Sequence, residues 1–142
     1  FVGKVRKLVD LDDRIEKWLS FFDLESKKGV ICKDLSKGMR QKLMIASAFI
    51  HDPQLVFLDE PFINLDPVYQ KIVREYLQDY VSSGGTIFMC SHILEISEKL
   101  CNRLAIVDAG KIVAEGNKDD LVKDGVGLEE FFLRSIGGGR KR

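Results

Sequence analysis

The sequence predicts an α/β domain with a parallel sheet. Two short apolar runs, Leu55–Leu58 and Thr86–Cys90, have the length and composition of buried strands. Between them, from Ile72 to Val81, apolar residues recur at helical spacing. Strand, helix and strand in this order indicate a parallel sheet, because parallel strands need a long crossover connection.

The composition limits the class of protein. A chain of 142 residues with 45% hydrophobic residues is long enough for one modest domain with a real core. Its 22 basic residues balance 22 acidic ones, so we expect no nucleic-acid partner, since such modules are usually basic. No apolar stretch approaches the ~20 residues of a membrane helix. The scattered Cys32, Cys90 and Cys101 form no C-x-x-C pair, which fits a reducing cytoplasm.

The first third of the chain is predicted to be helical. Residues 3–23 are expected to form a helix, and Lys37–Ile50 a second one with Ser36 as its N-cap. Pro53 restricts the residue before it, so the second helix should end near His51. The apolar residues at helical spacing in the first helix are Leu8, Leu11, Ile15, Trp18, Leu19 and Phe22.

Further along the chain, Asp66 and Pro67 predict the start of another helix, as cap and first helical residue. We expect that helix to end at the turn 82–85, and a short helix to span 94–100. The helix that begins at Pro67 is expected to have an apolar face, formed by Ile72, Val73, Tyr76, Leu77, Tyr80 and Val81.

The last third should begin with two strands, Leu104–Val107 and Ile112–Ala114, joined by a hairpin turn in which Gly110 supplies a positive φ. Residues 118–136 are expected to be helical, and 137–142 to form a flexible basic tail. The residues expected to dock the last helix are Leu128, Phe131 and Phe132.

Two adjacent carboxylates, Asp59 and Glu60, follow the first apolar run directly. Open α/β sheets bind their ligands at the carboxyl ends of their strands. Asp59 could hold Mg²⁺ there, directly or through water. Glu60 could orient and deprotonate a water that attacks a phosphate. A buried strand followed by a solvated acidic turn is the alternative interpretation.

Three further motifs stand in a fixed order around this strand. The run Asp34-Leu35-Ser36-Lys37-Gly38-Met39-Arg40-Gln41 opens a helix, Asn64-Leu65-Asp66-Pro67 follows the carboxylates, and Ser91-His92 ends the second strand. From about Leu35 to Glu115 this order resembles the ATP-binding cassette ATPases. The matching elements are the signature motif, the Walker B strand, the D-loop and the H-loop.

The resemblance implies a RecA-like P-loop NTPase core with a parallel sheet and an inserted helical subdomain. We expect residues 1–50 to be part of that subdomain with the signature motif, 51–116 core, and 117–136 a C-terminal helical region before the tail 137–142. The sequence holds no Walker A run, G-x-x-x-x-G-K-[ST]. We therefore expect a core truncated at its N-terminus, the C-terminal part of a cassette subunit.

The resemblance also assigns roles to single residues, with ATP and Mg²⁺ as cofactors. Ser36 would donate its hydroxyl to the γ-phosphate of ATP bound in the opposite subunit, and Gly38 would let the backbone approach that phosphate. Lys37 stands where the family has its first signature glycine and Met39 where it has glutamine. Lys37 would add positive charge near the phosphate in place of a glycine that lets the backbone approach closely.

In the same resemblance, Asp59 is the Mg²⁺ ligand, through water, and Glu60 is the general base. His92 would contact the γ-phosphate and hold the attacking water and Glu60 in place. Asp66 lies in the turn that crosses to the site of the partner subunit. Ile63 stands before Asn64, where the family usually has a small residue.

The resulting hypothesis is the energy-coupling ATPase of a membrane exporter of the drug, lipid or polysaccharide type. Its partners would be a second ABC ATPase subunit, head to tail, and a transmembrane permease, at the inner face of the cell membrane. Two alternatives stay open. A chromosome or repair ATPase of the same superfamily would need a long coiled coil, and no heptad run is present. A non-catalytic fragment or regulatory partner would fit the lack of a phosphate loop, and we expect the isolated chain to be inactive.

Overall fold

The computed structural model describes residues 2–5, 8–122 and 127–137, in two compact units that meet at Cys90 and Ser91 in the sequence. The first contains α1 (Val2–Val5), α2 (Leu11–Phe21), two 3-10 turns (Glu25–Lys27 and Cys32–Asp34), α3 (Lys37–Phe49), β1 (Leu55–Asp59), α4 (Pro67–Ser82) and β2 (Thr86–Cys90). The second contains α5 (Leu94–Leu100), β3 (Arg103–Asp108), β4 (Lys111–Asn117), α6 (Lys118–Leu121) and α7 (Leu128–Gly137).

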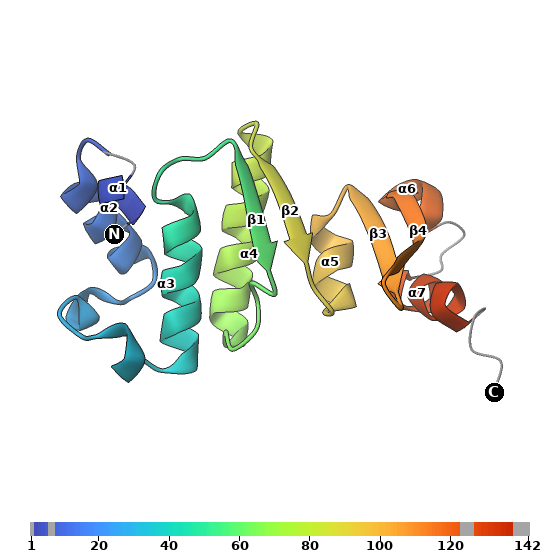
Figure 1. Cartoon of the computed structure of the whole chain (residues 1–142), viewed down its shortest axis with the longest axis horizontal. Coiled ribbons are helices and arrows are strands. Elements are labelled where there is room, and N and C mark those ends of the chain that lie inside the picture. Colours follow the sequence, from blue (N-terminus) through green and yellow to red (C-terminus); the bar gives the residue numbers. More distant parts are fainter. Residues whose placement is uncertain (1, 6–7, 123–126, 138–142) are drawn as a thin grey trace. The chain divides into compact units, whose positions relative to one another are not determined.

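A parallel pair of strands forms the sheet of the first unit. Strands β1 and β2 pair in register from Leu55 opposite Thr86 to Asp59 opposite Cys90. Helix α4 is the crossover between them and packs on one face of the sheet (Figure 1). Val56 and Leu58 of β1 are buried. The prediction of an α/β fold with a parallel sheet is therefore confirmed.

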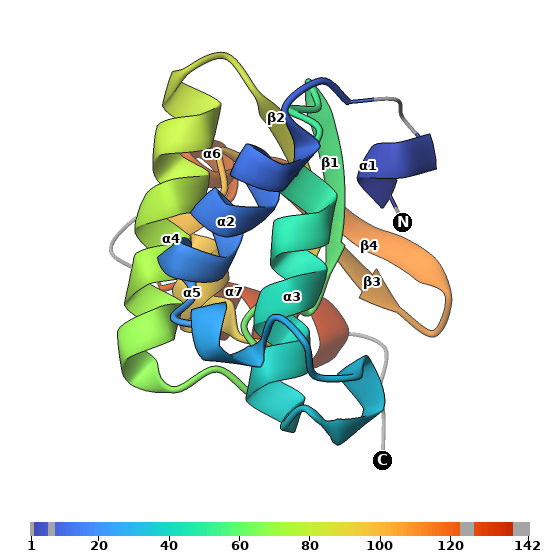
Figure 2. The same cartoon turned by 90° about the vertical axis from the view of Figure 1, so that its left-hand side faces the viewer.

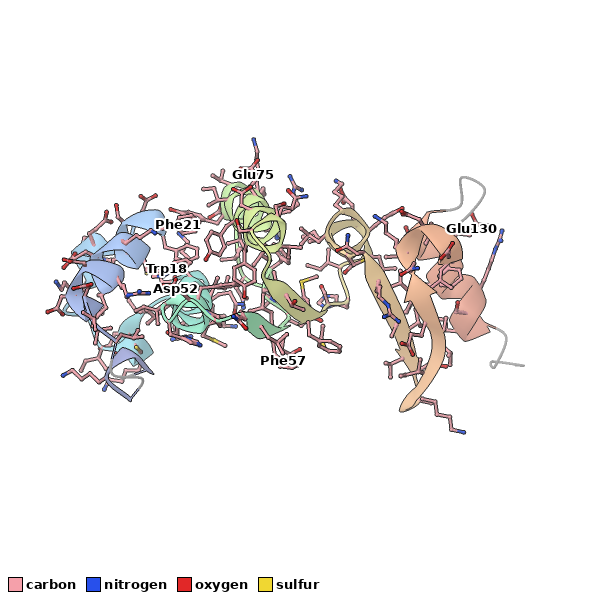
Figure 3. The ribbon with its side chains drawn as sticks, turned by 90° about the horizontal axis from the view of Figure 1, so that it is seen from above. Trp18, Phe21, Asp52, Phe57, Glu75 and Glu130 are labelled. Atoms are coloured by element: carbon pink, nitrogen blue, oxygen red, sulfur yellow. The ribbon has the colours of Figure 1, made fainter. Side chains whose placement is uncertain are left out.

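The other face of this sheet is exposed, which corrects the prediction that both strands are buried. Leu55, Phe57 and Phe88 are 49%, 70% and 60% exposed. The rings of Phe57 and Phe88 lie 5.7 Å apart, centroid to centroid. Figure 3 shows Phe57 on the side of the sheet away from α4. Because side chains alternate along a strand, Asp59 belongs to this same face and is exposed as well.

An aromatic cluster holds α2, α3 and α4 together. Trp18 of α2 stacks on Phe22 and on Phe49 of α3, with ring centroids 5.9 and 6.1 Å apart. Phe49 meets Tyr76 of α4 edge to face at 5.0 Å. Phe22 and Phe49 are 0% and 2% exposed, and burying each such side chain contributes roughly 1.5–3 kcal/mol. Figure 2 shows α2 beside α3 and α4. This packing fixes the direction in which α3 runs.

The helix starts that the sequence predicts are confirmed at two places, and the first helix is corrected. Ser36 caps α3 and Asp66 caps α4, with Pro67 as the first helical residue. The expected helix over 3–23 is instead two helices, α1 and α2, within the described residues. The chain turns between them at Asp10, whose φ of 58° lies in the left-handed region and so cannot continue a helix.

The second unit is a hairpin with helices around it. The helix predicted for 94–100 is confirmed as α5, and β3 pairs with β4 in an antiparallel hairpin, with both strands longer than predicted. Ala109 and Gly110 form its turn with φ values of 47° and 76°, the signs of a type I′ turn.

The region after β4 is not one helix. Helix α6 ends at Leu121, Val122 is not helical, and α7 begins at Leu128. Leu128 is 3% exposed, as expected for a docking residue, whereas Phe131 and Phe132 are half-buried. Gly137 ends α7, and the rest of the expected tail, 138–142, lies outside the described residues. No helix in the described ranges has the length and apolar character to cross a membrane.

Candidate functional site

The turn that follows β1 begins with a backbone in an unusual conformation. Glu60 has a φ of 46°, in the left-handed region that non-glycine residues seldom occupy. Its N–H donates to the carbonyl of Cys90 over 2.9 Å, so hydrogen bonding between the strands extends one residue past β1. Conformations of this kind cost about 1–3 kcal/mol and persist only where surrounding contacts enforce them. The strain therefore lies at the residue that the sequence predicts as the general base.

The rest of the turn is held from both ends. The N–H of Ile63 donates to the carbonyl of Glu60 over 3.2 Å, and the buried side chain of Phe62 is 1% exposed. Asn64 is a second left-handed residue, with a φ of 61°. At the far end, the Asp66 carboxylate accepts hydrogen bonds from the N–H groups of α4 at 3.0 and 3.1 Å. These contacts define the seven-residue turn 60–66 as an ordered loop.

The start of α3 presents groups that suit an anion. The Ser36 Oγ accepts a hydrogen bond from the Met39 N–H over 3.2 Å, which leaves its own proton able to be donated elsewhere. Ser36 and Lys37 are both exposed. The first N–H groups of a helix lack partners within the helix and lie at its positive end, so they attract negative charge. The predicted role of Ser36 and Lys37 toward a phosphate is compatible with this geometry.

Helix α3 and the turn 60–66 are in direct contact. A Cβ added to Gly38 would lie 2.8 Å from the backbone oxygen of Asn64, so only glycine fits there without movement. The Gln41 Nε2 donates to the carbonyls of Glu60 and Pro61 over 3.3 and 3.1 Å. The structure thus brings the signature segment and the carboxylate turn together. It gives Gly38 a role in packing besides the close phosphate approach that the sequence predicts.

Asp59 is the predicted Mg²⁺ ligand. It ends β1 and is exposed on the same face as Phe57. Within the described ranges, no group of three or more His, Cys, Asp and Glu side chains could hold a metal by itself. Mg²⁺ usually keeps several waters and binds through one or two carboxylates together with nucleotide phosphates. A single exposed carboxylate at a strand end fits that manner of binding, and Mg²⁺ would supply charge neutralisation for the phosphates.

A charged cluster lies beside the Asp66 cap. The ammonium of Lys42 is 2.9 Å from the centroid of the Tyr69 ring and donates to the Phe22 carbonyl over 3.2 Å. Burial lowers the pKa of Lys42, against the opposing effect of Asp66 and Asp23. The hydrogen bond from the Tyr69 hydroxyl to Asp23, with burial adding to it, raises the pKa of Tyr69 to about 12. The cluster links α3 to the first turn of α4.

His92 belongs to the second unit, where it is exposed. The residue before it, Ser91, accepts a hydrogen bond from the Ile93 N–H through its Oγ over 3.1 Å, which shapes the turn into α5. The predicted role of His92 toward Glu60 remains a prediction, because Glu60 belongs to the first unit and His92 to the second.

Sequence reasoning assigned no role to two glutamines that hold the turn. Besides Gln41, the Gln70 Nε2 donates from α4 to the carbonyls of Phe62 and Leu65 over 3.4 and 3.2 Å. One signal was available for Gln41: it lies three residues after Gly38, on the same face of one helix. No comparable signal marks Gln70.

Comparison with known proteins finds relatives over most of the chain. Residues 3–63 match the family model described as ABC transporter. Nod factor export ATP-binding protein I of Cupriavidus metallidurans is 40% identical over 117 residues, which is 82% of this chain and 39% of the relative. The protein of the same name from Rhizobium leguminosarum bv. viciae is 40% identical over 118 residues, 83% of this chain and 38% of the relative. The chain thus spans less than two fifths of the length of these curated relatives.

Solved structures show the same likeness. A structure described as the ATP-binding subunit of an ABC transporter has a TM-score of 0.87 at 30% identity, over 94% of this chain and 58% of that one. A nucleotide-free ATP-binding cassette from an ABC transporter has a TM-score of 0.66 at 22% identity, which shows the fold alone. These features define the class of protein: an ATP-binding cassette fold with a carboxylate pair at the end of β1. The chain belongs to the ABC transporter ATPase family.

Proposed function

We propose that a full-length subunit carrying this sequence binds and hydrolyses ATP and couples that reaction to export across a membrane. One observation carries the proposal: Glu60, directly after the Asp59 strand end, is held in a left-handed conformation with its N–H bonded to Cys90. A strained residue with fixed backbone at the carboxyl end of a parallel strand is suited to catalysis.

In the proposed reaction, Glu60 orients a water and accepts its proton as the water oxygen attacks the γ-phosphorus of ATP and the bond to the leaving ADP oxygen breaks. Asp59 is the residue that would hold Mg²⁺. His92 would contact the γ-phosphate and hold the water against Glu60. The remaining residues bind and align the nucleotide, which is most of what phosphoryl transfer asks of a protein.

The start of α3 would serve the nucleotide of a second subunit. Ser36 and Lys37 are exposed and Gly38 is half-buried, so the end of the helix is accessible to a partner. We propose a head-to-tail dimer in which this segment completes the opposite site and Asp66 lies near the crossing. In this arrangement residues 1–50 are part of the helical subdomain, 51–116 belong to the core, and α6 and α7 belong to a C-terminal region.

The transport step is proposed from the relatives, whose printed names describe Nod factor export. We propose that this subunit likewise works with a transmembrane permease at the inner face of the cell membrane, and that it drives export.

The test compares two substitutions in the full-length subunit. Glu60→Gln keeps the shape and hydrogen bonding of the side chain but removes its basicity, so phosphate release should fall by about 10²–10⁴-fold. ATP should stay bound, and the dimer should accumulate in gel filtration with Mg-ATP. Asp59→Asn should instead weaken Mg²⁺-dependent ATP binding itself. Near-normal turnover by Glu60→Gln, or the same behaviour in both variants, would overturn the assignment of base and metal ligand.

A further inference from the structure

We propose that Gln41 is a positioning residue, which holds the Glu60 peptide in its reacting conformation and ties the catalytic carboxylate to the signature helix. The inference deepens the proposed function and rests on Glu60 being the base. Gln41 itself was assigned no part in the reaction above.

The peptide groups on both sides of the Glu60 Cα are fixed by hydrogen bonds. On one side its N–H donates to the Cys90 carbonyl over 2.9 Å. On the other side its carbonyl accepts from the Ile63 N–H over 3.2 Å and from the Gln41 Nε2 over 3.3 Å. The same Gln41 nitrogen reaches the next carbonyl, that of Pro61, over 3.1 Å. Gln41 is thus the contact from outside the turn that fixes two successive carbonyls.

The backbone strain at Glu60 explains why such a contact matters. With a φ of 46°, Glu60 occupies a conformation from which a non-glycine residue tends to relax. Relaxation toward extended backbone would rotate the Glu60 side chain away from its present direction. The half-buried Gln41 amide donates to the carbonyls of Glu60 and Pro61, on either side of the Pro61 Cα, and so resists that rotation.

Helix α3 joins this contact to the proposed phosphate end. Ser36 caps the helix, and Gln41 lies five residues further along the same uninterrupted helix. Gly38, between them, touches the backbone of Asn64 in the same turn. Displacement of α3 at its first turn would therefore be passed to the Glu60 and Pro61 carbonyls. In the proposed dimer, Ser36 contacts the nucleotide of the opposite subunit and Glu60 acts on the nucleotide of its own subunit. The geometry therefore couples the two nucleotide sites through α3.

The experiment replaces the donor while keeping the side chain's size. Gln41→Met in the full-length subunit should lower kcat about tenfold, which corresponds to about 1.4 kcal/mol in the barrier. The KM for ATP and the ATP affinity of the monomer should stay within about twofold. Gln70→Met removes a donor to the same turn, from α4 to Phe62 and Leu65, and should change kcat by less than about twofold. The exposed Gln78→Met is the matched control for the chemical change and should change nothing.

A purely structural role is separated by two further measurements. In a Glu60→Gln background the added Gln41→Met should not lower the residual rate again, because the base it positions is gone. Gln41→Glu keeps the length of the side chain but places a carboxylate against two carbonyl oxygens, so its kcat should be as low as that of Gln41→Met. Gln41→Glu replaces Gln41→Met in the experiment if Gln41→Met fails to fold.

The outcomes distinguish the inference from the proposed function. If Gln41→Met or Gln41→Glu turns over at the unsubstituted rate while Glu60→Gln is inactive, the positioning role is wrong and the base assignment stands. A full tenfold loss on top of Glu60→Gln would also overturn the positioning role. If Glu60→Gln itself keeps normal turnover, the proposed function fails first.

Discussion

Gly38→Ala tests the contact between the signature helix and the carboxylate turn. An added Cβ would lie 2.8 Å from the Asn64 carbonyl oxygen, whereas ordinary contacts are 3.4–4 Å. The neighbour is a backbone atom, so it cannot rotate away as a long side chain can. Either α3 or the turn 60–66 must then move by about half an ångström.

Two effects of opposite sign decide the magnitude. Alanine is favoured over glycine in a helix by about 0.8–1 kcal/mol, and Gly38 is the second residue of α3. Overpacking against a fixed group typically costs about 1–3 kcal/mol. Because Asn64 already has a φ of 61°, the turn has little freedom to yield. We therefore expect a net loss of about 1–2 kcal/mol, although helix propensity alone predicts a gain.

The assay is thermal unfolding of the full-length subunit, paired with phosphate release. A loss of 1–2 kcal/mol should lower the unfolding temperature by roughly 2–8 °C, and the displaced turn should reduce kcat. Gly29→Ala is the matched control, because an added Cβ there meets no atom within 4 Å and should be neutral. A rise in unfolding temperature for Gly38→Ala would refute the contact.

Two further predictions concern the cap and the tyrosines. Asp66→Ala should destabilise α4 by about 1 kcal/mol, since two N–H groups lose their acceptor, whereas Asp66→Asn should keep most of the cap. If Asp66→Asn loses turnover as Asp66→Ala does, at an unchanged unfolding temperature, the charge of Asp66 has a role beyond capping. Burial, with Asp52 adding to it, raises the pKa of Tyr76 from 10.0 to about 12. A raised folded-state pKa gives stability that is complete below pH 10 and is lost as the pH rises through about 12. Tyr76→Phe should therefore reduce the loss of stability between pH 10 and about 12, followed by circular dichroism and tyrosinate absorbance. If Tyr76 in the folded protein titrates at its usual pKa of 10.0, the prediction is wrong.

Features set by local chemistry could be predicted from the sequence. Ser36 and Asp66 were expected as caps, and both accept hydrogen bonds from the first turn of their helices. Capping is a contact across two or three residues, so composition and order are enough to reveal it. The hairpin turn at Ala109 and Gly110 was predictable for the same reason.

Burial of the sheet could not be predicted in the same way. The continuous apolar run of β1 indicates a strand able to be buried on both faces, yet Phe57 is 70% exposed while Val56 beside it is 3% exposed. An apolar pattern tells which faces can be buried but not what covers them. The break at Asp10 was missed for a related reason. The helical spacing of apolar residues continues through this part of the sequence, although the backbone turns there.

The contact of Gln41 lay beyond sequence reasoning because it joins residues 19 and 20 positions apart. A half-buried glutamine on an amphipathic helix has no pattern that identifies its acceptors. Only the packing of α3 against the end of β1 selects the Glu60 and Pro61 carbonyls. The sequence therefore predicts candidate residues, but it does not reveal how their backbone is held in place.

The backbone places the two adjacent carboxylates differently, in keeping with the different roles proposed for them. In a regular strand, Asp59 and Glu60 would simply alternate between the two faces of the sheet. Asp59 keeps that alternation and lies with Phe57 on the exposed face, where a metal with its waters has room. Glu60 leaves it, because a φ of 46° ends the strand and turns the chain. The direction of the Glu60 side chain no longer follows the alternation of side chains along the strand. It is set by the hydrogen bonds that the Glu60 peptide groups make to Cys90 and accept from Gln41. A residue oriented in this way can be moved by a helix, whereas one oriented by the strand cannot. Under the proposed mechanism, Glu60 is therefore the carboxylate through which the position of α3 would control turnover.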